Sequence, residues 1–353
     1  HEGLREVGRR RVPVQPDLDG HAFQGVHHID ALACLAASAA LAVSDIPIKE
    51  IISEVRIARV DGQFVVNPFR SELEKADMDF MIAATENNLV MVEGESQECS
   101  EEDLVKALEL AHQAVQIQIK AQQELRQKIG ITIKREYAKP EQNENLHQQI
   151  IQTYKDKIYQ IAKSFSSKHQ RSDALSQLQQ ELQTSLGDEV DELTKKLAKK
   201  YFEDLQWEVV RNMILDEKVR LDGRGLEDIR PLAMEVDVLP SPHGSSLFTR
   251  GETQSLTTVT LGTPLDELLI ESAAKSDYSS FILHYNFPPF STGEIKPMRG
   301  PGRREVGHGN LAQRSLKPLL QGSDYPYTIR VVSDILGSTG SSSMATVCAG
   351  SLA

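Results

Sequence analysis

The pattern of apolar positions along the chain divides it into three regions. In the first region, the apolar, alanine-rich residues 31–43 predict a buried helix. Alternating apolar residues in segments 54–67 and 78–92, each interrupted by turn-forming residues, predict two β-hairpins. Residues 1–28 are charged and irregular, and they predict no element. The first region, residues 1–99, is therefore of mixed α and β type.

The second region, residues 100–215, carries apolar residues at helical spacing. Ser100 is suited to begin a helix and Gly130 to end it. Further apolar stripes occupy residues 146–165, 175–182 and 190–201. Glutamine and lysine residues fill the faces between these stripes. The pattern predicts an all-helical domain, a small bundle in which we identify no chemistry.

The third region, residues 216–353, returns to mixed texture. Strand-like runs occur at residues 255–261, 280–285 and 327–332. A long segment rich in glycine, proline and arginine, residues 287–309, separates the last two runs. The chain ends in a Ser/Gly loop, residues 337–343, followed by a run of small residues that predicts a tightly packed helix.

A short internal similarity links the two mixed regions. Residues 30–38 (DALACLAAS) align with residues 343–351 (SMATVCAGS), and both segments are small-residue helices with serine at the same late position. The alignment places Asp30 opposite Ser343. Together with the mixed texture on both sides of the helical region, this similarity indicates a duplicated core.

Composition and charge limit the classes of function. The 39 Lys and Arg residues against 51 Asp and Glu residues give a net charge of −12, which excludes a globally basic nucleic-acid binder but not a local basic patch. The 3 cysteines exclude a disulfide scaffold and favour a reducing compartment such as the cytoplasm. The longest apolar run is too short to cross a bilayer, so we expect no membrane association.

The Ser/Gly loop is the first candidate for chemistry. Its glycines allow backbone N–H groups to converge, and its serines Ser341, Ser342 and Ser343 add neutral donors at the start of a helix. That combination is typical of a phosphate or oxyanion site, although a flexible linker has the same composition. No lysine followed by serine or threonine comes after the glycines, so the loop is not a Walker P-loop.

A basic stretch is the second candidate. Arginine pairs bidentately with phosphate, and the interspersed glycines permit close approach of the backbone. Bordering aromatic residues, Tyr285, Phe287 and Phe290, are able to stack on bases. The alternative is a solvated loop above core aromatics. The stretch consists of Lys296, Arg299, Arg303, Arg304 and His308, with Arg314 and Lys317 just beyond.

Metal ligation has little support in the sequence. His27 and His28 with Asp30 lack the spacing of a helical zinc site. Asp222, Glu227 and Asp228 lie near a turn, where carboxylates ordinarily cap backbone N–H groups.

At these candidates the chain resembles the bacterial polynucleotide phosphorylase family. The resemblance extends over residues 30–353, with the motifs in the family's order. Those resembling its second core are residues 222–224 (DGR), 243–254 (HGSSLFTRGETQ), 281–290 (FILHYNFPPF), 302–309 (GRREVGHG) and 340–345 (GSSSMA). Those resembling the end of its first core are residues 35–47 (LAASAALAVSDIP) and 60–68 (VDGQFVVNP).

The resemblance implies an α+β fold with two ribonuclease-PH-like (βαβα) cores, both partial, flanking an all-helical domain. The first core then ends near residue 99, the helical domain spans residues 100–215, and the second, catalytic core starts at residue 216. The implied activity is processive 3′-to-5′ phosphorolysis of single-stranded RNA, which releases nucleoside diphosphates in mRNA degradation and runs in reverse as RNA polymerisation. A homotrimer and RNA-degrading assemblies are the implied protein partners.

The resemblance also assigns roles to residues of both candidates. It places the phosphate-binding serines at Ser341, Ser342 and Ser343, with Ser342 and Ser343 as the catalytic pair. It places RNA and phosphate contacts at Arg303 and Arg304 and an RNA contact at His308. Fixed N–H dipoles, hydroxyls and arginines compensate the charge of two anionic reactants.

The chain also departs from the family pattern, and these departures change the expected activity. Asp30 occupies the position of Ser343 in the first core, and a carboxylate repels phosphate, so we expect that core to be catalytically silent. The family's Mg²⁺ ligands lie downstream of its serine loop, beyond Ala353, so we expect no metal ligand here and an incomplete, inactive fragment. The alternative function is a catalytically inactive RNA-binding or assembly subunit of the same fold. A hydrolytic ribonuclease is a third possibility.

Overall fold

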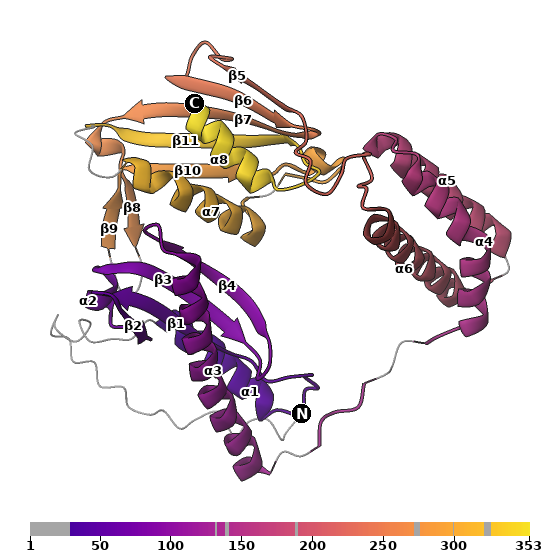
Figure 1. Ribbon diagram of the computed structural model, residues 1–353, viewed down its shortest axis with the longest axis horizontal. Coiled ribbons are helices and arrows are strands. Elements are labelled where there is room, and N and C mark those ends of the chain that lie inside the picture. The colour runs from indigo at the N-terminus through magenta and orange to yellow at the C-terminus, as the bar shows by residue number, and fades with distance from the viewer. Residues whose placement is uncertain are drawn as a thin grey trace. The chain divides into compact units, whose positions relative to one another are not determined.

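The chain folds into two compact units, one within His1–Ala138 and the other within Lys139–Ala353. The computed structural model in Figure 1 describes residues 29–130, 133–137, 141–187, 190–271, 276–298, 300–320 and 326–353. Residues 1–28, for which the sequence predicts no element, lie outside this described part.

The first unit contains a four-stranded antiparallel sheet in the order β2-β1-β3-β4. Strands β1 (Ser53–Val60) and β2 (Gln63–Val66) form the first predicted hairpin, and β3 (Ala76–Ala84) and β4 (Leu89–Ser96) form the second. The short helix α2 (Arg70–Leu73) joins the hairpins. At the first turn Asp61 and Gly62 take positive φ angles of 48° and 76°, a backbone conformation that suits an Asp-Gly pair. Both hairpin predictions are confirmed.

Helices α1 (Ile29–Ala42) and α3 (Glu101–Ile129) contact each other and strand β1. The apolar stripe of α3 is buried against β1 and β3; it consists of Ala107, Ala111, Val115 and Ile119. We predicted that this helix opens the bundle of the second region, and its packing corrects that prediction. Helical spacing identifies the apolar face of a helix, but it does not say which partner covers that face.

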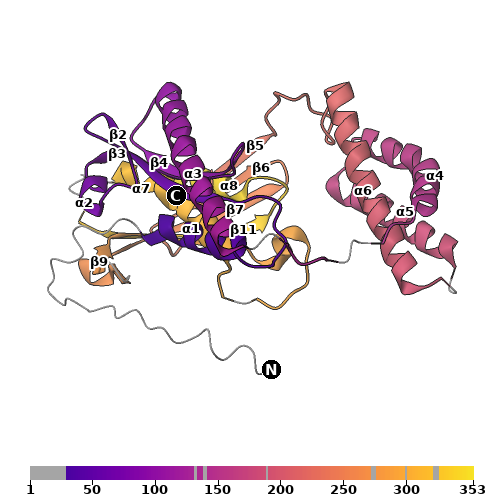
Figure 2. The same ribbon diagram turned by 90° about the horizontal axis from the view of Figure 1, so that it is seen from below.

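Helices α4 (Glu144–Lys163), α5 (Lys168–Leu186) and α6 (Glu192–Glu217) form the bundle, side by side in Figures 1 and 2. Their shared core contains the stripes expected from the sequence, including Ile150, Tyr154, Leu182 and Tyr201. Asn143, Ser167 and Asp191 accept backbone hydrogen bonds at the three helix starts, so each helix has a side-chain N-cap. The predicted bundle is confirmed for these helices.

The second unit also contains a five-stranded mixed sheet in the order β10-β11-β7-β6-β5. Strands β5 (Leu232–Val236), β6 (Gly244–Arg250) and β7 (Thr253–Gly262) are antiparallel, and β11 (Thr328–Gly337) lies antiparallel to β7. Strand β10 (Phe281–Asn286) is parallel to β11. Strands β8 (Leu268–Glu271) and β9 (Ser276–Ser279) form a separate hairpin.

Two helices cover this sheet and contact each other (Figure 1): α7 (Arg303–Leu320), which packs on β10, and α8 (Ser342–Leu352), which packs on β6, β7 and β11. The three predicted strands and the terminal helix are confirmed.

Helix α7 is a correction, because the glycines and arginines of residues 287–309 indicate an irregular segment. Glu305 accepts a hydrogen bond from the Gly302 N–H just before the helix begins. Gly309, Ala312 and Leu316 form its buried face. This short apolar stripe begins only after Arg303 and Arg304, so the composition of the segment does not indicate a helix there.

Packing of α3 on the first sheet predicts a difference between two isoleucines of that helix. Ile119→Ala empties a site that is 2% exposed and is expected to destabilise the first unit by about 2–5 kcal/mol. Ile117, 72% exposed, is the matched control, and Ile117→Ala is expected to change stability by less than about 0.5 kcal/mol. In Ile119→Ala, hydrogen exchange measured by mass spectrometry should show that the amides of β1 and β3 lose protection. Loss confined to α4, α5 and α6 would contradict this packing.

Candidate active site

The three serines of the Ser/Gly loop lie at the amino end of α8. Ser341 occupies the N-cap position with extended backbone angles (φ −73°, ψ 92°), and its hydroxyl makes no capping hydrogen bond. The first N–H groups of a helix have no partner within the helix, and the helix dipole places partial positive charge there. An anion at this position would therefore meet N–H donors that have no partner within the helix and the Ser341 hydroxyl, which is not used in capping.

Ser342 and Ser343 are the first two residues of α8 and are 1% and 4% exposed. The Ser342 Oγ lies 2.7 Å from the hydroxyl of Tyr285 on β10. Burial raises the pKa of Tyr285 although the hydrogen bond to Ser342 lowers it, so the phenol stays protonated and able to donate. When Tyr285 donates, the Ser342 hydroxyl proton is free to point to an anion. The Ser343 hydroxyl has no hydrogen-bond partner within the described residues.

A stack of rings joins this serine to the first turns of α7. The Tyr285 ring stacks on His308 at a centroid distance of 5.4 Å and on Phe287 at 6.2 Å. The Arg304 guanidinium lies over the Phe287 ring, 4.9 Å from its centroid. Arg304 and His308 are four residues apart, so they share one face of the helix. The fold thus brings Arg304, His308 and Ser342 around Tyr285.

His308 is a neutral group at this site. Burial lowers the pKa of His308, and the positive charge of Arg304 lowers it further. The imidazole therefore offers one N–H donor and one acceptor nitrogen at neutral pH. Positive charge in the cluster comes from Arg304.

The aromatic residues behave differently from the expectation that they stack on bases. Tyr285 is 5% exposed and its ring stacks on His308 and Phe287, so the ring is not available to a base. Its hydroxyl instead positions Ser342. Phe290, 57% exposed, lines a cavity of about 940 Å³ together with Lys296. Of the three aromatics, Phe290 is the most available for stacking.

The basic stretch is not one cluster. Arg303 is exposed at the first position of α7, and Lys296 forms a 2.5 Å ion pair with Glu294. With a rise of about 1.5 Å per residue, Arg314 lies about 15 Å along the helix from Arg304, and Lys317 about 20 Å. Arg299 lies outside the described residues.

Two further arginines, which the sequence did not single out, lie against the Ser/Gly loop. A Cβ placed on Gly340 would come within 3.1 Å of the Arg230 Nη1 atom and 3.5 Å of the Arg250 Nη2 atom. Arg250 is the last residue of β6, and Arg230 precedes β5. Arg250 belongs to the motif at residues 243–254, the one signal that pointed to it. Glycine at position 340 keeps room for both guanidinium groups.

No group of three or more His, Cys, Asp or Glu side chains in the described residues is arranged to hold a metal ion. Asp222 accepts the backbone N–H of Arg224 at 3.4 Å, and Asp228 accepts that of Gly225 at 2.8 Å, which are the capping roles expected from the sequence; Asp222 also pairs with the Arg224 guanidinium at 2.9 Å. His27 and His28 lie outside the described residues, as does the side chain of Asp30. The described residues therefore do not fit a metal centre.

Comparison with known proteins agrees with this architecture. Residues 50–114 match the family model "3′ exoribonuclease family, domain 2", and residues 228–353 match "3′ exoribonuclease family, domain 1". Residues 145–225 match "Polyribonucleotide nucleotidyltransferase, RNA binding domain". The bundle and the five-stranded sheet with its covering helices thus correspond to two separate family domains.

Curated relatives match over nearly the whole chain. A polyribonucleotide nucleotidyltransferase of Phocaeicola vulgatus is 55% identical over 93% of this chain and 46% of its own length. One of Porphyromonas gingivalis is 52% identical over 92% of the chain and 44% of its own length. One of Amoebophilus asiaticus is 53% identical over 100% of the chain and 52% of its own length. The chain spans about half the length of the curated relatives it matches.

Fold and site define a protein built from ribonuclease-PH-like 3′ exoribonuclease domains around a helical domain. Over 92–100% of its length the chain is similar to polyribonucleotide nucleotidyltransferases, at 52–55% identity, and its helical domain matches their RNA-binding domain.

The position of Arg304 near His308 predicts a titration shift. Arg304→Ala removes a positive charge, so the pKa of His308 should rise, yet stay below the ordinary value for histidine because burial is the larger cause. His284, whose pKa is lowered by burial and by Arg330, is the internal control and should not move. NMR titration of the imidazole signals measures both. An unchanged His308 pKa in the variant would contradict this geometry.

Proposed function

We propose that this chain is part of an enzyme that degrades single-stranded RNA from its 3′ end by phosphorolysis. The observation that carries the proposal is the start of α8, where unpaired N–H groups meet Ser341 and Ser343 beside the Tyr285–Ser342 hydrogen bond. An uncharged hydroxyl and N–H site suits the small, doubly charged phosphate ion. The relatives at 52–55% identity support the same activity.

Inorganic phosphate is the proposed attacking group. One of its oxygens forms a bond to the phosphorus of the last phosphodiester, and the bond from that phosphorus to the 3′ oxygen of the preceding nucleotide breaks. A nucleoside diphosphate leaves, and the shortened RNA receives a proton on its new 3′ hydroxyl. Ser342, Ser343 and the α8 N–H groups hold the attacking phosphate in line, and Arg304 reduces repulsion between the two phosphates. The reverse reaction extends RNA.

The RNA side of the proposed site is the start of α7. Arg303 is exposed and Arg304 is held over Phe287, so both guanidinium groups are available to the RNA backbone. Neutral His308 is suited to a hydrogen bond with phosphate or sugar. For the first core, Asp30 opposite Ser343 supports a catalytically silent role.

The wider setting is also a proposal. The whole protein is proposed to form a homotrimer, to enter RNA-degrading assemblies and to use Mg²⁺, although the described residues contain no group of His, Cys, Asp or Glu side chains arranged to hold it. A cytoplasmic location is supported by three cysteines that remain free thiols. No helix in the described ranges has the length and apolar character needed to cross a membrane.

The serines provide the direct test of the proposed function. In the full-length protein, Ser342→Ala combined with Ser343→Ala should lower phosphate-dependent release of nucleoside diphosphate from poly(A) by about 100-fold or more, since each change removes a donor to the phosphate. Ser351→Ala is the matched control, because Ser351 lies exposed on the same helix and bonds only the Val347 carbonyl.

Other results would point to other functions. Undiminished phosphorolysis in the double variant would contradict the assignment of the serines. Nucleoside monophosphates released without phosphate would indicate a hydrolytic ribonuclease. RNA binding without any product would indicate a non-catalytic subunit.

Tyr285 gives a second, finer prediction. Tyr285→Phe removes one hydrogen bond to Ser342 and should raise the KM for phosphate about 3- to 10-fold while leaving the KM for RNA unchanged. Steady-state kinetics with each substrate varied in turn separates the two constants. A change in the KM for RNA alone would be inconsistent with a role for Tyr285 through Ser342.

A further inference from the structure

Two adjoining cavities of the second unit form one groove outside the candidate active site. One measures about 540 Å³ and lies among α4, α5 and α6, and the other measures about 640 Å³ and lies between the start of α5 and the segment leading to β5. Both are lined by Arg171, Ile214 and Leu221, so they are continuous. We name this feature the α5–α6 groove.

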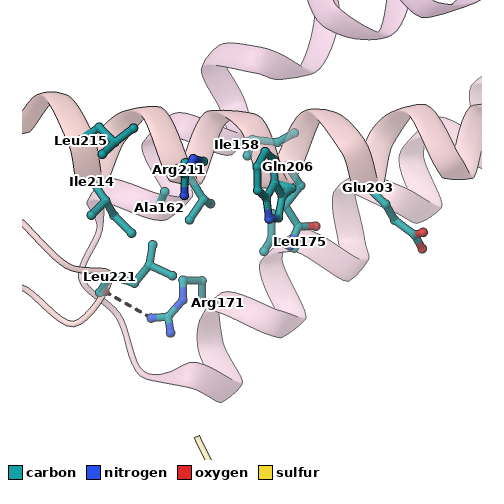
Figure 3. A pocket seen from close by; sticks show the side chains of 12 residues that line it. Ile158, Ala162, Arg171, Leu175, Glu203, Gln206, Arg211, Ile214, Leu215 and Leu221 are labelled. Carbon is teal, nitrogen blue, oxygen red and sulfur yellow. Dashed lines mark hydrogen bonds between the residues drawn. The ribbon is translucent and has the colours of Figure 1, made fainter. Parts of the chain in front are cut away.

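One half of the groove is apolar and contains the only tryptophan of the chain. Figure 3 shows Ile158, Leu175, Ile214 and Leu215 around this half, with Arg171 bonded to Leu221 at one end. Trp207 lines it and is 66% exposed, and the Arg211 guanidinium lies 5.5 Å from the centre of the Trp207 ring. A large aromatic face beside an apolar hollow is suited to stack on a flat heterocycle.

The other half is strongly basic. Lys168, Arg171 and Arg220 line it, and none of the three has a carboxylate within ion-pair distance in the described part of the chain. Backbone carbonyls hold them: Lys168 Nζ donates to Ser338 O at 3.2 Å, and Arg220 donates to Leu226 O at 2.8 Å. Such bonds orient the cations and leave their charge uncompensated. In a chain of net charge −12, this concentration points to an anionic ligand.

Partly neutralised cations surround these three. Arg224 and Arg230 also line the basic half, and both lie near Asp222, at 2.9 Å and 3.7 Å. Glu252 lines it as well, and its carboxylate accepts a hydrogen bond from the backbone N–H of Lys168 at 3.4 Å. The lining therefore keeps a net positive charge after its two carboxylates are counted.

We propose that the α5–α6 groove binds a free nucleoside polyphosphate, with the base on Trp207 and the phosphates at Lys168, Arg171 and Arg220. The order of the groove, an aromatic apolar half continuous with a basic half, matches a base joined to a phosphate chain. Each half has the volume of a small-molecule site. Three uncompensated cations in one confined place fit the clustered charge of a triphosphate better than the evenly spaced charges of an RNA strand.

The groove is distinct from the serine site. It shares no lining residue with the cluster of Tyr285, Ser342, His308 and Arg304, although Arg230 of its basic half also lies beside Gly340 of the Ser/Gly loop. It does reach the same loop from another side, since Thr339 lines its basic half and Lys168 bonds Ser338.

Because Trp207 is the only tryptophan, its fluorescence reports on the groove alone. Titration of the whole chain with ATP, in buffer containing EDTA and no phosphate, should quench this fluorescence to saturation. Tripolyphosphate should displace ATP, and adenosine should bind at least about 10-fold more weakly because it lacks the charged contacts.

Variants locate the binding on both halves. Arg220→Ala and Lys168→Ala should each weaken ATP binding about 10-fold, as should Trp207→Leu when followed by calorimetry. Lys120→Ala, which removes an exposed lysine of α3, and the Ser342→Ala, Ser343→Ala double variant should bind ATP as the unaltered chain does.

The proposal would be overturned by the absence of saturable quenching with millimolar ATP, by equal ATP affinity of Arg220→Ala and the unaltered chain, or by quenching with oligo(A) but not with ATP. The last result would assign the groove to RNA. Loss of ATP binding in the serine double variant would also contradict it, because the ligand would then occupy the serine site. Binding is measured without turnover, so it is independent of phosphorolysis.

Discussion

The candidate active site depends on close contact between a small-residue helix and a polar layer of the sheet below it. Helix α8 buries only small side chains, Ser342, Ser343, Ala345, Thr346 and Ala349, and Phe248 of β6 packs against the two alanines. Hydroxyl groups link helix and sheet: Thr346 bonds Ser333 at 2.8 Å, and Ser333 bonds Ser255 at 2.9 Å. On another strand, Ser246 donates to the Ala349 carbonyl at 2.6 Å. Buried hydroxyls require partners, so this layer fixes the position of the helix.

Fixing α8 fixes the donors at its amino end. Thr346 donates to the Ser342 carbonyl at 3.2 Å, and Tyr285 bonds the Ser342 hydroxyl from β10. Tyr285 in turn stacks on His308 of α7. One continuous set of contacts therefore runs from the sheet through the serines to the basic helix. Preorganised dipoles of this kind stabilise an anion without rearrangement when it binds.

Sequence patterns predicted the elements whose signals are local. The two hairpins followed from alternation around turn residues such as Asp61-Gly62, and helices α4 to α6 followed from apolar stripes. The apolar stripe of α3 does not identify the element that packs on this helix, because any apolar surface is able to cover the stripe. Helix α7 was missed because Gly307 and Gly309 lie in its first turns, where composition indicates a loop.

The sequence identified the residues proposed to bind phosphate and RNA, but not the residues that position them. The Ser/Gly loop and the Arg303–Arg304 pair were apparent from residue type and from family resemblance. Tyr285 as a partner of Ser342, and Arg230 and Arg250 beside Gly340, arise from strand pairing and from contacts between residues 50 to 110 positions apart. Residue spacing along the chain does not predict such contacts, because they depend on the order of the strands in the sheet.

The claim that the start of α8 is a phosphate site is tested most directly by a crystal structure of the full-length protein with bound inorganic phosphate. We expect the ion at the amino end of α8, within hydrogen-bond distance of the Ser343 hydroxyl and the backbone N–H groups of Ser342 and Ser343, with Tyr285 still bonded to Ser342. Phosphate bound by other residues, with this helix start empty, would contradict it.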